Sequence, residues 1–332
     1  MPELSVVIPA YKAEAHLSAC LSGFASQTAD SDRFEVIVVD DCSPDSTSAL
    51  ARSFAGVRVL RHETNQGAAS ARNTGAESAE AEVLLFVDSD VIPKPGLIEG
   101  TLALFEDGSV RAATGRYGAE PANDTSFARY KALWTWHCWE RTGATTGHSG
   151  HLQGALSAVR RDDLLAVGGF DPSYEGGSVE DYELSARLRQ RGLRIVFDDR
   201  IGGKHHFPGL GTVARNYWDR TRMWVRLAPE QKRFSSGQAN RRSGIAAIAA
   251  LGGAAGFLFP PLLPLALPAQ AIWFAASAPF LSFVARREGV SFALYAAGVH
   301  WTLSTVVGAA ALSAPFGRGS RREGGEMSSA HE

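Results

Sequence analysis

The chain has 332 residues, a formal net charge of -2 and a hydrophobic content of 45%. That length fits one large domain or two ordinary ones, and the balanced charge argues against a general nucleic-acid binder. The three cysteines are an odd number without metal-site spacing, which argues against a disulfide framework or a zinc centre. The N-terminus lacks the basic segment, apolar run and cleavage site of a secretory signal. We therefore expect the first domain in the cytoplasm.

The first 120 residues alternate short apolar runs with helix-like segments. Runs as continuously apolar as these are typical of parallel strands buried on both faces, and the alternation predicts an open α/β sheet with right-handed crossovers. Ligands of such sheets bind beyond the carboxyl ends of the strands. The expected strands are 4–9, 34–40, 57–61 and 83–88, and the expected helices are 13–27, 45–55 and 67–79.

The middle of the chain, 111–234, is less regular and rich in Gly, Trp and His. Its clearest element is a helix that starts at Glu180, with Gly192 as its C-cap and a strand resuming at Leu193. A basic amphipathic segment near 212–227 interleaves Arg with Trp, Tyr, Met and Leu. Such a helix can lie at a membrane interface, and an ordinary packed helix with a solvated face is the alternative.

Two long tracts near the C-terminus carry no charged residue: 245–285 and 290–316. Both exceed the ~20 apolar residues that a membrane-spanning helix needs. Prolines at 260, 261, 264 and 268 predict that the first tract forms a hairpin of two spans. The arginine pairs at 241–242 and 286–287 would then share the cytoplasmic side. The second tract is expected as a third span, with a re-entrant or interfacial segment as the alternative.

These tracts divide the chain. We expect a catalytic domain over 1–235, with a nucleotide-binding half at 1–120 and an acceptor half at 121–235. A membrane region of two to three helices should follow over 244–316. The polar tail, 317–332, is expected to be disordered.

Asp88 and Asp90 directly follow the fourth strand. Alternate residues of an extended segment point to the same side, so both carboxylates can face one point. Two anions in that position are tolerated when a divalent cation lies between or beside them, and Mg²⁺ takes one or two carboxylates plus substrate phosphates. For an isolated Asp-x-Asp, a turn cap beside an exposed carboxylate would be the commoner explanation.

Other strand ends carry polar groups that would suit a nucleotide. Asp40 and Asp41 could accept hydrogen bonds from a ribose or base edge, and Tyr11 could stack on the base. Gly67 opens a helix whose N-terminus could receive phosphate charge, with Arg72 one turn further on. Each residue also has an ordinary structural explanation, but their combination favours a nucleotide site.

The chain resembles the inverting family 2 glycosyltransferases of GT-A fold. The resemblance covers roughly 4–226 and rests on six ordered motifs: "SVVIPAYKAEAHL", "VIVVDDCSPDST", "NQGAASARNTG", "FVDSD", "GGFD" and "EDYELSARLRQRG". It implies a mostly parallel sheet flanked by helices, followed here by C-terminal transmembrane helices. It assigns the nucleotide to Pro9, Tyr11, Asp41, Arg72 and Asp88, the metal and diphosphate motif to Asp88 and Asp90, and the catalytic base to Asp181.

Asp181 also suits that role on chemical grounds. Inverting transfer needs one carboxylate to take the proton of the attacking hydroxyl, while a metal stabilises the departing diphosphate. Asp181 opens a predicted helix and is free to point into a cleft, although an N-terminal carboxylate can also merely complement the helix dipole. The resemblance also places at this point of the chain a histidine that completes the metal site or contacts the diphosphate, and of the pair His205 and His206 we choose His205. Leu156 stands where the family usually has an asparagine, which affects the acceptor side.

The sequence therefore predicts a hexosyltransferase-type enzyme of the cell inner (plasma) membrane, multi-pass, with a cytoplasmic catalytic domain. Its expected partners are a nucleoside-diphosphate sugar, Mg²⁺ or Mn²⁺, membrane lipids and a lipid-linked or glycan acceptor of cell-envelope or polysaccharide biosynthesis, with no nucleic acid. Two alternatives are a nucleotidyltransferase and a non-catalytic membrane protein that binds a nucleotide sugar.

Overall fold

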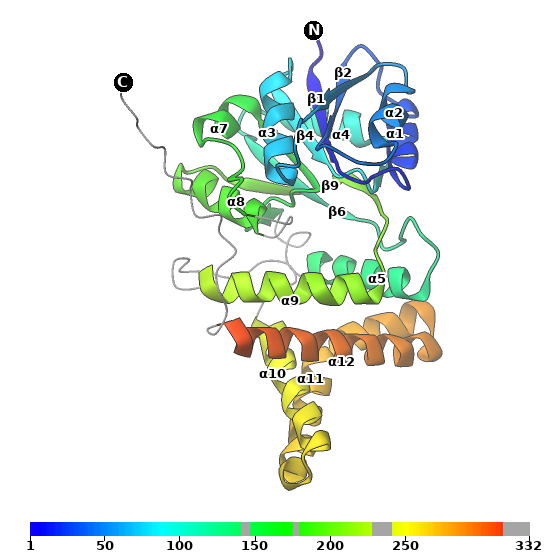
Figure 1. The fold of residues 1–332 in the computed structure, drawn as a ribbon, viewed down its shortest axis with the longest axis vertical. Coiled ribbons are helices and arrows are strands. Elements are labelled where there is room, and N and C mark those ends of the chain that lie inside the picture. The colour runs from blue at the N-terminus through cyan, green and yellow to red at the C-terminus, as the bar shows by residue number, and fades with distance from the viewer. Residues whose placement is uncertain (141–146, 175–178, 228–240, 315–332) are drawn as a thin grey trace.

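A computed structural model describes residues 1–140, 147–174, 179–227 and 241–314 of the chain (Figure 1). An α/β domain lies at one end, two long helices lie beneath it, and the C-terminal helices form the other end. The tail expected to be disordered and the expected domain end near 235 both lie outside the described residues.

The α/β domain is built on one nine-stranded sheet with the order β3-β2-β1-β4-β8-β6-β9-β5, in which β7 also pairs with β9. The pairs β1–β2, β2–β3 and β1–β4 are parallel, whereas β8 runs antiparallel to β4 and β6. All four predicted strands are present. The strands are β1 (Leu4–Ala10), β2 (Phe34–Asp40), β3 (Val57–Arg61), β4 (Val83–Val87), β5 (Val91–Pro93), β6 (Ala112–Tyr117), β7 (His148–Ser149), β8 (Leu156–Arg160) and β9 (Ile195–His205).

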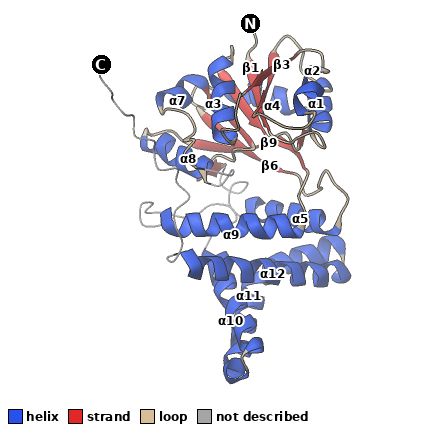
Figure 2. Cartoon of the chain, viewed as in Figure 1, coloured by secondary structure: helices blue, strands red, loops and turns tan. Residues whose placement is uncertain are grey.

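Helices cover both faces of this sheet (Figure 2). Because successive strand residues face opposite sides, Val6 and Ile8 of β1 pack into one core and Val7 packs into the other. Every residue of such a strand is therefore buried, on one face of the sheet or the other, as the continuous apolar runs predict. The covering helices are α1 (Leu17–Ala25), α2 (Thr47–Arg52), α3 (Ala68–Ser78), α4 (Leu97–Phe105), α7 (Arg161–Ala166) and α8 (Glu180–Gln190).

Two long helices lie between the sheet and the C-terminal region: α5 (Ser126–Glu140) and α9 (Leu210–Leu227). The helix expected near 212–227 corresponds to α9, whereas α5 was not predicted. Sequence reasoning missed α5 because it is buried on several sides, so its apolar residues do not form one stripe at helical spacing.

The C-terminal region consists of α10 (Arg241–Leu258), a 3₁₀ turn at Pro260–Leu262, α11 (Leu263–Glu288) and α12 (Val290–Ser313). α10 and the first part of α11 form a hairpin that projects from the rest of the molecule (Figure 1). The turn falls at the prolines, where a continuous helix would lose backbone hydrogen bonds. Among the described residues, 260–288 and 290–313 are helical stretches long and apolar enough to cross a membrane.

α12 does not extend the projecting hairpin. It lies beside α9, across the direction of the hairpin (Figure 1). Phe280 and Val284 of α11 and Ala296 of α12 pack in one apolar cluster with Tyr130 of α5 and Val213 of α9. This packing joins the C-terminal helices to the α/β domain.

Candidate active site

One cavity of about 980 Å³ lies at the carboxyl ends of the parallel strands and extends toward the C-terminal helices. β1, β2 and β4 run in the same direction, so the residues that follow them meet at one edge of the sheet. All eight site residues singled out in the sequence line this cavity: Pro9, Tyr11, Asp41, Arg72, Asp88, Asp90, Asp181 and His205.

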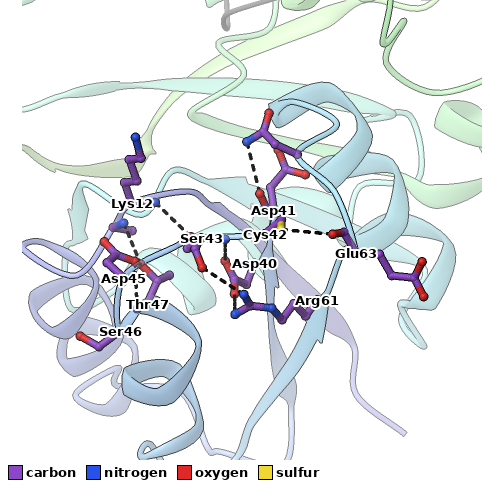
Figure 3. Close-up of polar contacts among 12 residues, drawn as sticks. Lys12, Asp40, Asp41, Cys42, Ser43, Asp45, Ser46, Thr47, Arg61 and Glu63 are labelled. Carbon is purple, nitrogen blue, oxygen red and sulfur yellow. Dashed lines mark hydrogen bonds and ion pairs between the residues drawn. The ribbon is translucent and has the colours of Figure 1, made fainter.

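Asp40 stabilises the loop after β2 (Figure 3). Its fully buried carboxylate accepts hydrogen bonds from Arg61 Nη1 at 2.7 Å and from the backbone amide of Ser43 at 2.9 Å. Arg61 Nη2 also donates to the carbonyl of Ser43 at 3.0 Å. These contacts fix the turn that carries Asp41 into the cavity, and they account for Asp40 as a structural residue.

Asp41 connects the β2 end with the start of α3. Its carboxylate accepts hydrogen bonds from the amides of Gln66 and Gly67 at 2.9 and 2.7 Å, and it contacts His62 Nδ1 at 2.7 Å. The other ring nitrogen of His62 lies 2.9 Å from Thr74 Oγ1. Sequence reasoning missed His62, although its position one residue after β3 was a usable signal.

Pro9 and Tyr11 form the wall of the cavity at the end of β1. Tyr11 is 46% exposed, which leaves its ring available to a planar group. The next residue, Lys12, adopts a left-handed conformation with φ of 51°, and its amide donates to Ser43 Oγ at 3.0 Å. The turn after β1 is therefore tied to the loop after β2.

Arg72 of α3 connects the end of β4 with the start of α8. Its buried guanidinium donates to Asp88 Oδ1 at 2.8 Å and to Glu180 Oε1 at 3.1 Å. Gly154 lies beside this arrangement, where a Cβ would be in ordinary van der Waals contact, 3.4 Å from Arg72 Cζ and 3.5 Å from Asp181 Cβ. Glu180, the neighbour of the predicted base, is thus committed to an ion pair.

Asp90 and His205 lie together at the cavity edge, with His205 Nε2 3.3 Å from Asp90 Oδ2. β9 sets this contact, because His205 pairs with Val91 of β5 and the amide of His206 donates to the carbonyl of Asp90 at 2.9 Å. Burial alone would raise the pKa of Asp90, but the nearby His205 and His16 lower it. Asp88 has the opposite shift, since burial raises its pKa and the facing Arg72 only partly offsets this.

The donor set fits a divalent cation. Asp90 Oδ1 and His205 Nδ1 are both buried, and neither atom has a hydrogen-bond partner among the described residues. No group of three or more His, Cys, Asp or Glu side chains in the described ranges is placed to hold a metal ion. Mg²⁺ and similar ions need only one or two carboxylates when a substrate diphosphate supplies further oxygens. Asp90 and His205, which carry the unpartnered atoms, would hold such an ion together with the donor, while the neighbouring Asp88 faces Arg72.

Asp181 occupies the first turn of α8 and faces the cavity. Its Oδ2 accepts a hydrogen bond from the amide of Gly154 at 3.3 Å. Burial, followed by the charge of Glu180, raises the pKa of Asp181 to about 7. A carboxylate with a pKa near neutrality is well matched to proton transfer at physiological pH.

The side of the cavity beyond Asp181 is aromatic. His151 stacks between Trp139 and Tyr182, with ring centroids 5.3 and 4.2 Å apart, and Trp224 meets Tyr182 edge-on at 4.6 Å. Burial lowers the pKa of His151 to about 3, so its ring is neutral. Trp139 and His151 belong to the Trp- and His-rich centre of the sequence, whose position suggested an acceptor region but no individual roles.

The pKa of Asp181 predicts a pH dependence. As the expected general base, Asp181 must be ionised, so kcat/KM for the expected sugar transfer should fall as the pH drops through about 7 and level off above it. Steady-state rates between pH 5.5 and 9 would measure this, with thermal stability recorded at each pH. A rate that stays constant between pH 6 and 8 would show that this carboxylate does not limit catalysis.

The sheet, its flanking helices and the strand-end cavity define a GT-A fold. The family model described as "Glycosyl transferase family 2" matches residues 5–168. Glycosyltransferase AglE from Haloferax volcanii is 32% identical over 220 residues, covering 65% of this chain and 70% of that protein. The chain belongs to glycosyltransferase family 2.

Other relatives are longer proteins. The pre-mycofactocin glycosyltransferase of Mycobacterium tuberculosis is 30% identical over 209 residues, covering 61% of this chain and 41% of that protein. Validoxylamine A glucosyltransferase of Streptomyces hygroscopicus is 30% identical over 240 residues, covering 59% of this chain and 50% of that protein. The chain thus spans about half the length of these relatives, and the comparisons give no support to a nucleotidyltransferase.

Solved structures agree on the fold. The mannosyltransferase PcManGT from Pyrobaculum calidifontis, in complex with GDP-Man and Mn²⁺, superposes with a TM-score of 0.58 at 19% identity, covering 95% of this chain and 87% of that one. TarS from Staphylococcus aureus gives a TM-score of 0.51 at 18% identity and covers 93% of this chain and 55% of that one. At these identities the likeness establishes the GT-A fold alone.

Proposed function

We propose that this protein transfers a sugar, with inversion, from a nucleoside-diphosphate donor to the hydroxyl of a lipid-linked or glycan acceptor. The observation that carries the proposal is the state of the five carboxylates that line the cavity. Asp41, Asp88, Asp90 and Glu180 each pair with a cationic or imidazole side chain. Among the described residues, Asp181 alone of the five has no such partner, which leaves it available as a base.

The proposed reaction follows from these positions. The acceptor hydroxyl gives its proton to Asp181 as its oxygen attacks the anomeric carbon of the donor sugar. The bond between that carbon and the diphosphate oxygen breaks, and its electron pair leaves with the diphosphate. Attack opposite the leaving group inverts the anomeric configuration. Arg72 would bind the diphosphate, while Tyr11 and Asp41 would receive the base and ribose.

A divalent cation, Mg²⁺ or Mn²⁺, would neutralise negative charge on the departing diphosphate. The Pyrobaculum mannosyltransferase structure is a complex with GDP-Man and Mn²⁺, which supports a divalent cation and a nucleotide sugar at this site. The unpartnered Asp90 Oδ1 supports it independently. The site is therefore proposed to bind metal and donor together.

The C-terminal hairpin is proposed to associate with a membrane. Large apolar side chains are exposed around its end, among them Phe257 at 58%, Leu258 at 76% and Leu265 at 66%. An 18-residue helix such as α10 is about 27 Å long, close to the thickness of the hydrocarbon core. The arginine pairs at 241–242 and 286–287 would remain on the cytoplasmic side with the catalytic domain. Assignment to the plasma membrane and the number of spans stay predictions.

A donor panel tests the proposed function. The full chain in lipid vesicles would be incubated with radiolabelled nucleoside-diphosphate sugars and a bacterial lipid extract, with and without EDTA. We expect one donor to give a labelled product in the organic phase, with inverted anomeric configuration by NMR and a strong loss of product in EDTA. Retained configuration, or transfer of the nucleotide in place of the sugar, would contradict the proposal. Vesicle flotation checks membrane association separately.

A further inference from the structure

The catalytic cavity continues beyond the residues used so far. Its lining passes from Asp181 along α9 and ends between α10 and α12. At that end the walls are mainly apolar, with Ala247 and Ile248 from α10 and Leu303, Val307 and Ala311 from α12, although Ser304 also lines it. The cavity therefore changes from a charged chamber at the strand ends to an apolar groove between two helices.

This groove, formed by Ala247, Ile248, Leu303, Val307 and Ala311, opens on the surface of the hairpin. Ile248 lines the cavity and is also 72% exposed, so it marks the opening. The surrounding stretch 245–285 contains no charged residue. An apolar chain could therefore pass from the outer surface of the hairpin into the groove without crossing a charged surface.

Cationic side chains also line the cavity. Arg220 of α9 and Arg241 of α10 both line the cavity, and the charge of Arg220 acts on Asp181. The aromatic side chain of Trp224 lines the same portion. Two guanidinium groups on a cavity with polar and apolar walls suit the phosphate of an amphipathic molecule.

We propose that the groove between α10 and α12 binds the apolar chain of an acceptor lipid, with its phosphate near Arg220 and Arg241 and its reactive end at Asp181. This inference rests on the proposed glycosyltransferase function and specifies the acceptor as a phosphate-bearing lipid. The acceptor enters from the hairpin side, opposite the wall formed by Pro9 and Tyr11, where the nucleotide is proposed to bind. Donor and acceptor then approach the base from different directions.

Photo-crosslinking tests the groove without knowledge of the natural acceptor. The probe is hexadecyl phosphate with a diazirine near the end of its chain, added to the full chain in vesicles. Labelled residues would be mapped by mass spectrometry. We expect labels on Ala247, Val307 or Ala311, and competition by unlabelled hexadecyl phosphate but not by inorganic phosphate. Labels confined to exposed hairpin residues such as Leu258 and Leu265 would overturn the proposal.

A matched pair of substitutions sharpens the test. Val307 lines the groove, whereas the neighbouring Val306 is half-buried and is not among the lining residues. Val307→Trp should lower groove labelling by about tenfold, which corresponds to one step of 1.4 kcal/mol in binding, and Val306→Trp should leave it unchanged. Equal effects would overturn the proposal. Binding of the nucleoside diphosphate, measured on both variants, reports whether the catalytic domain is folded. If Val307→Trp does not fold, the positions labelled in the wild type decide whether the proposal holds.

The outcome is separable from that of the proposed function. Groove labelling with no sugar transfer from any donor would contradict the enzymatic proposal and leave the lipid site standing. Sugar transfer to soluble glycans with no groove labelling would support the enzymatic proposal and contradict the lipid site.

Discussion

Asp181→Asn is expected to lower the rate of sugar transfer by about 10²–10⁴-fold, the usual contribution of a general base. Donor binding should change little, because the diphosphate and nucleotide residues lie on other elements. The measurement is single-turnover transfer at saturating donor, with donor affinity determined by calorimetry on the same preparation. Unchanged transfer would refute the assignment of Asp181 as the base.

Glu183→Gln is the matched control for that variant. Glu183 lies on the same helix and its carboxylate pairs with Arg187 at 2.6 Å, away from the cavity lining. This i,i+4 pair is half-buried and touches neither the base nor the cavity lining, so the variant should retain transfer. A loss similar to that of Asp181→Asn would point to disturbance of α8 rather than removal of a base.

Asp181→Asn should also change the thermal stability of the protein. The pKa of Asp181 is raised to about 7 in the folded protein, above the value of about 4 for an unfolded aspartate. The folded state therefore binds the proton more tightly, and the stability linked to this group, complete below the unfolded pKa, is lost as the pH rises through 7. Because asparagine cannot ionise, Asp181→Asn should melt at a higher temperature than the wild type at pH 8.

Loss of the cation ligand is the second large effect. Asp90→Asn should reduce transfer by about 10³-fold at low Mn²⁺, equivalent to about 4 kcal/mol of transition-state stabilisation. Millimolar Mn²⁺ should restore part of the activity, because Asp88 and the donor diphosphate still offer oxygens. EDTA treatment of the wild type should give a comparable loss that Mn²⁺ or Mg²⁺ reverses.

Asp198→Asn provides the comparison for the Asp90 variant. Asp198 pairs with the exposed Arg200 at 2.9 Å and does not line the cavity. Its substitution should leave both the activity and the Mn²⁺ dependence unchanged. If Asp90→Asn behaved like Asp198→Asn, or if metal-stripped protein transferred sugar at the full rate, the metal proposal would be refuted.

The donor side of the cavity could be predicted because its information is local. Each apolar run ends at a definite residue, so Asp41, Asp88 and the end of β1 could be placed at one edge of a parallel sheet. The contact between Asp90 and His205 depends on the register of β5 against β9, which nothing local specifies. The family resemblance suggested His205, whereas the register explains it.

Other features depend on tertiary packing and could not be predicted. The sequence does not indicate that His62 would contact Asp41, since a lone histidine after a strand has many possible neighbours. The charge-free tract from residue 290 gave the length and apolar character of α12 but not its direction. That direction follows from packing of residues such as Ala296 against Val213 of α9. The apolar composition of this tract predicts that its side chains are buried, but it does not show whether lipid or protein covers them.

The contact of Arg72 with both Asp88 and Glu180 has a consequence for the order of substrate binding. A donor diphosphate that takes over the guanidinium weakens its hold on Glu180, the residue adjacent to the base. Less compensated negative charge beside Asp181 then makes that carboxylate a stronger proton acceptor once the donor is in place. Loading of the donor would thus raise the proton affinity of Asp181 above that in the empty enzyme before the second substrate arrives.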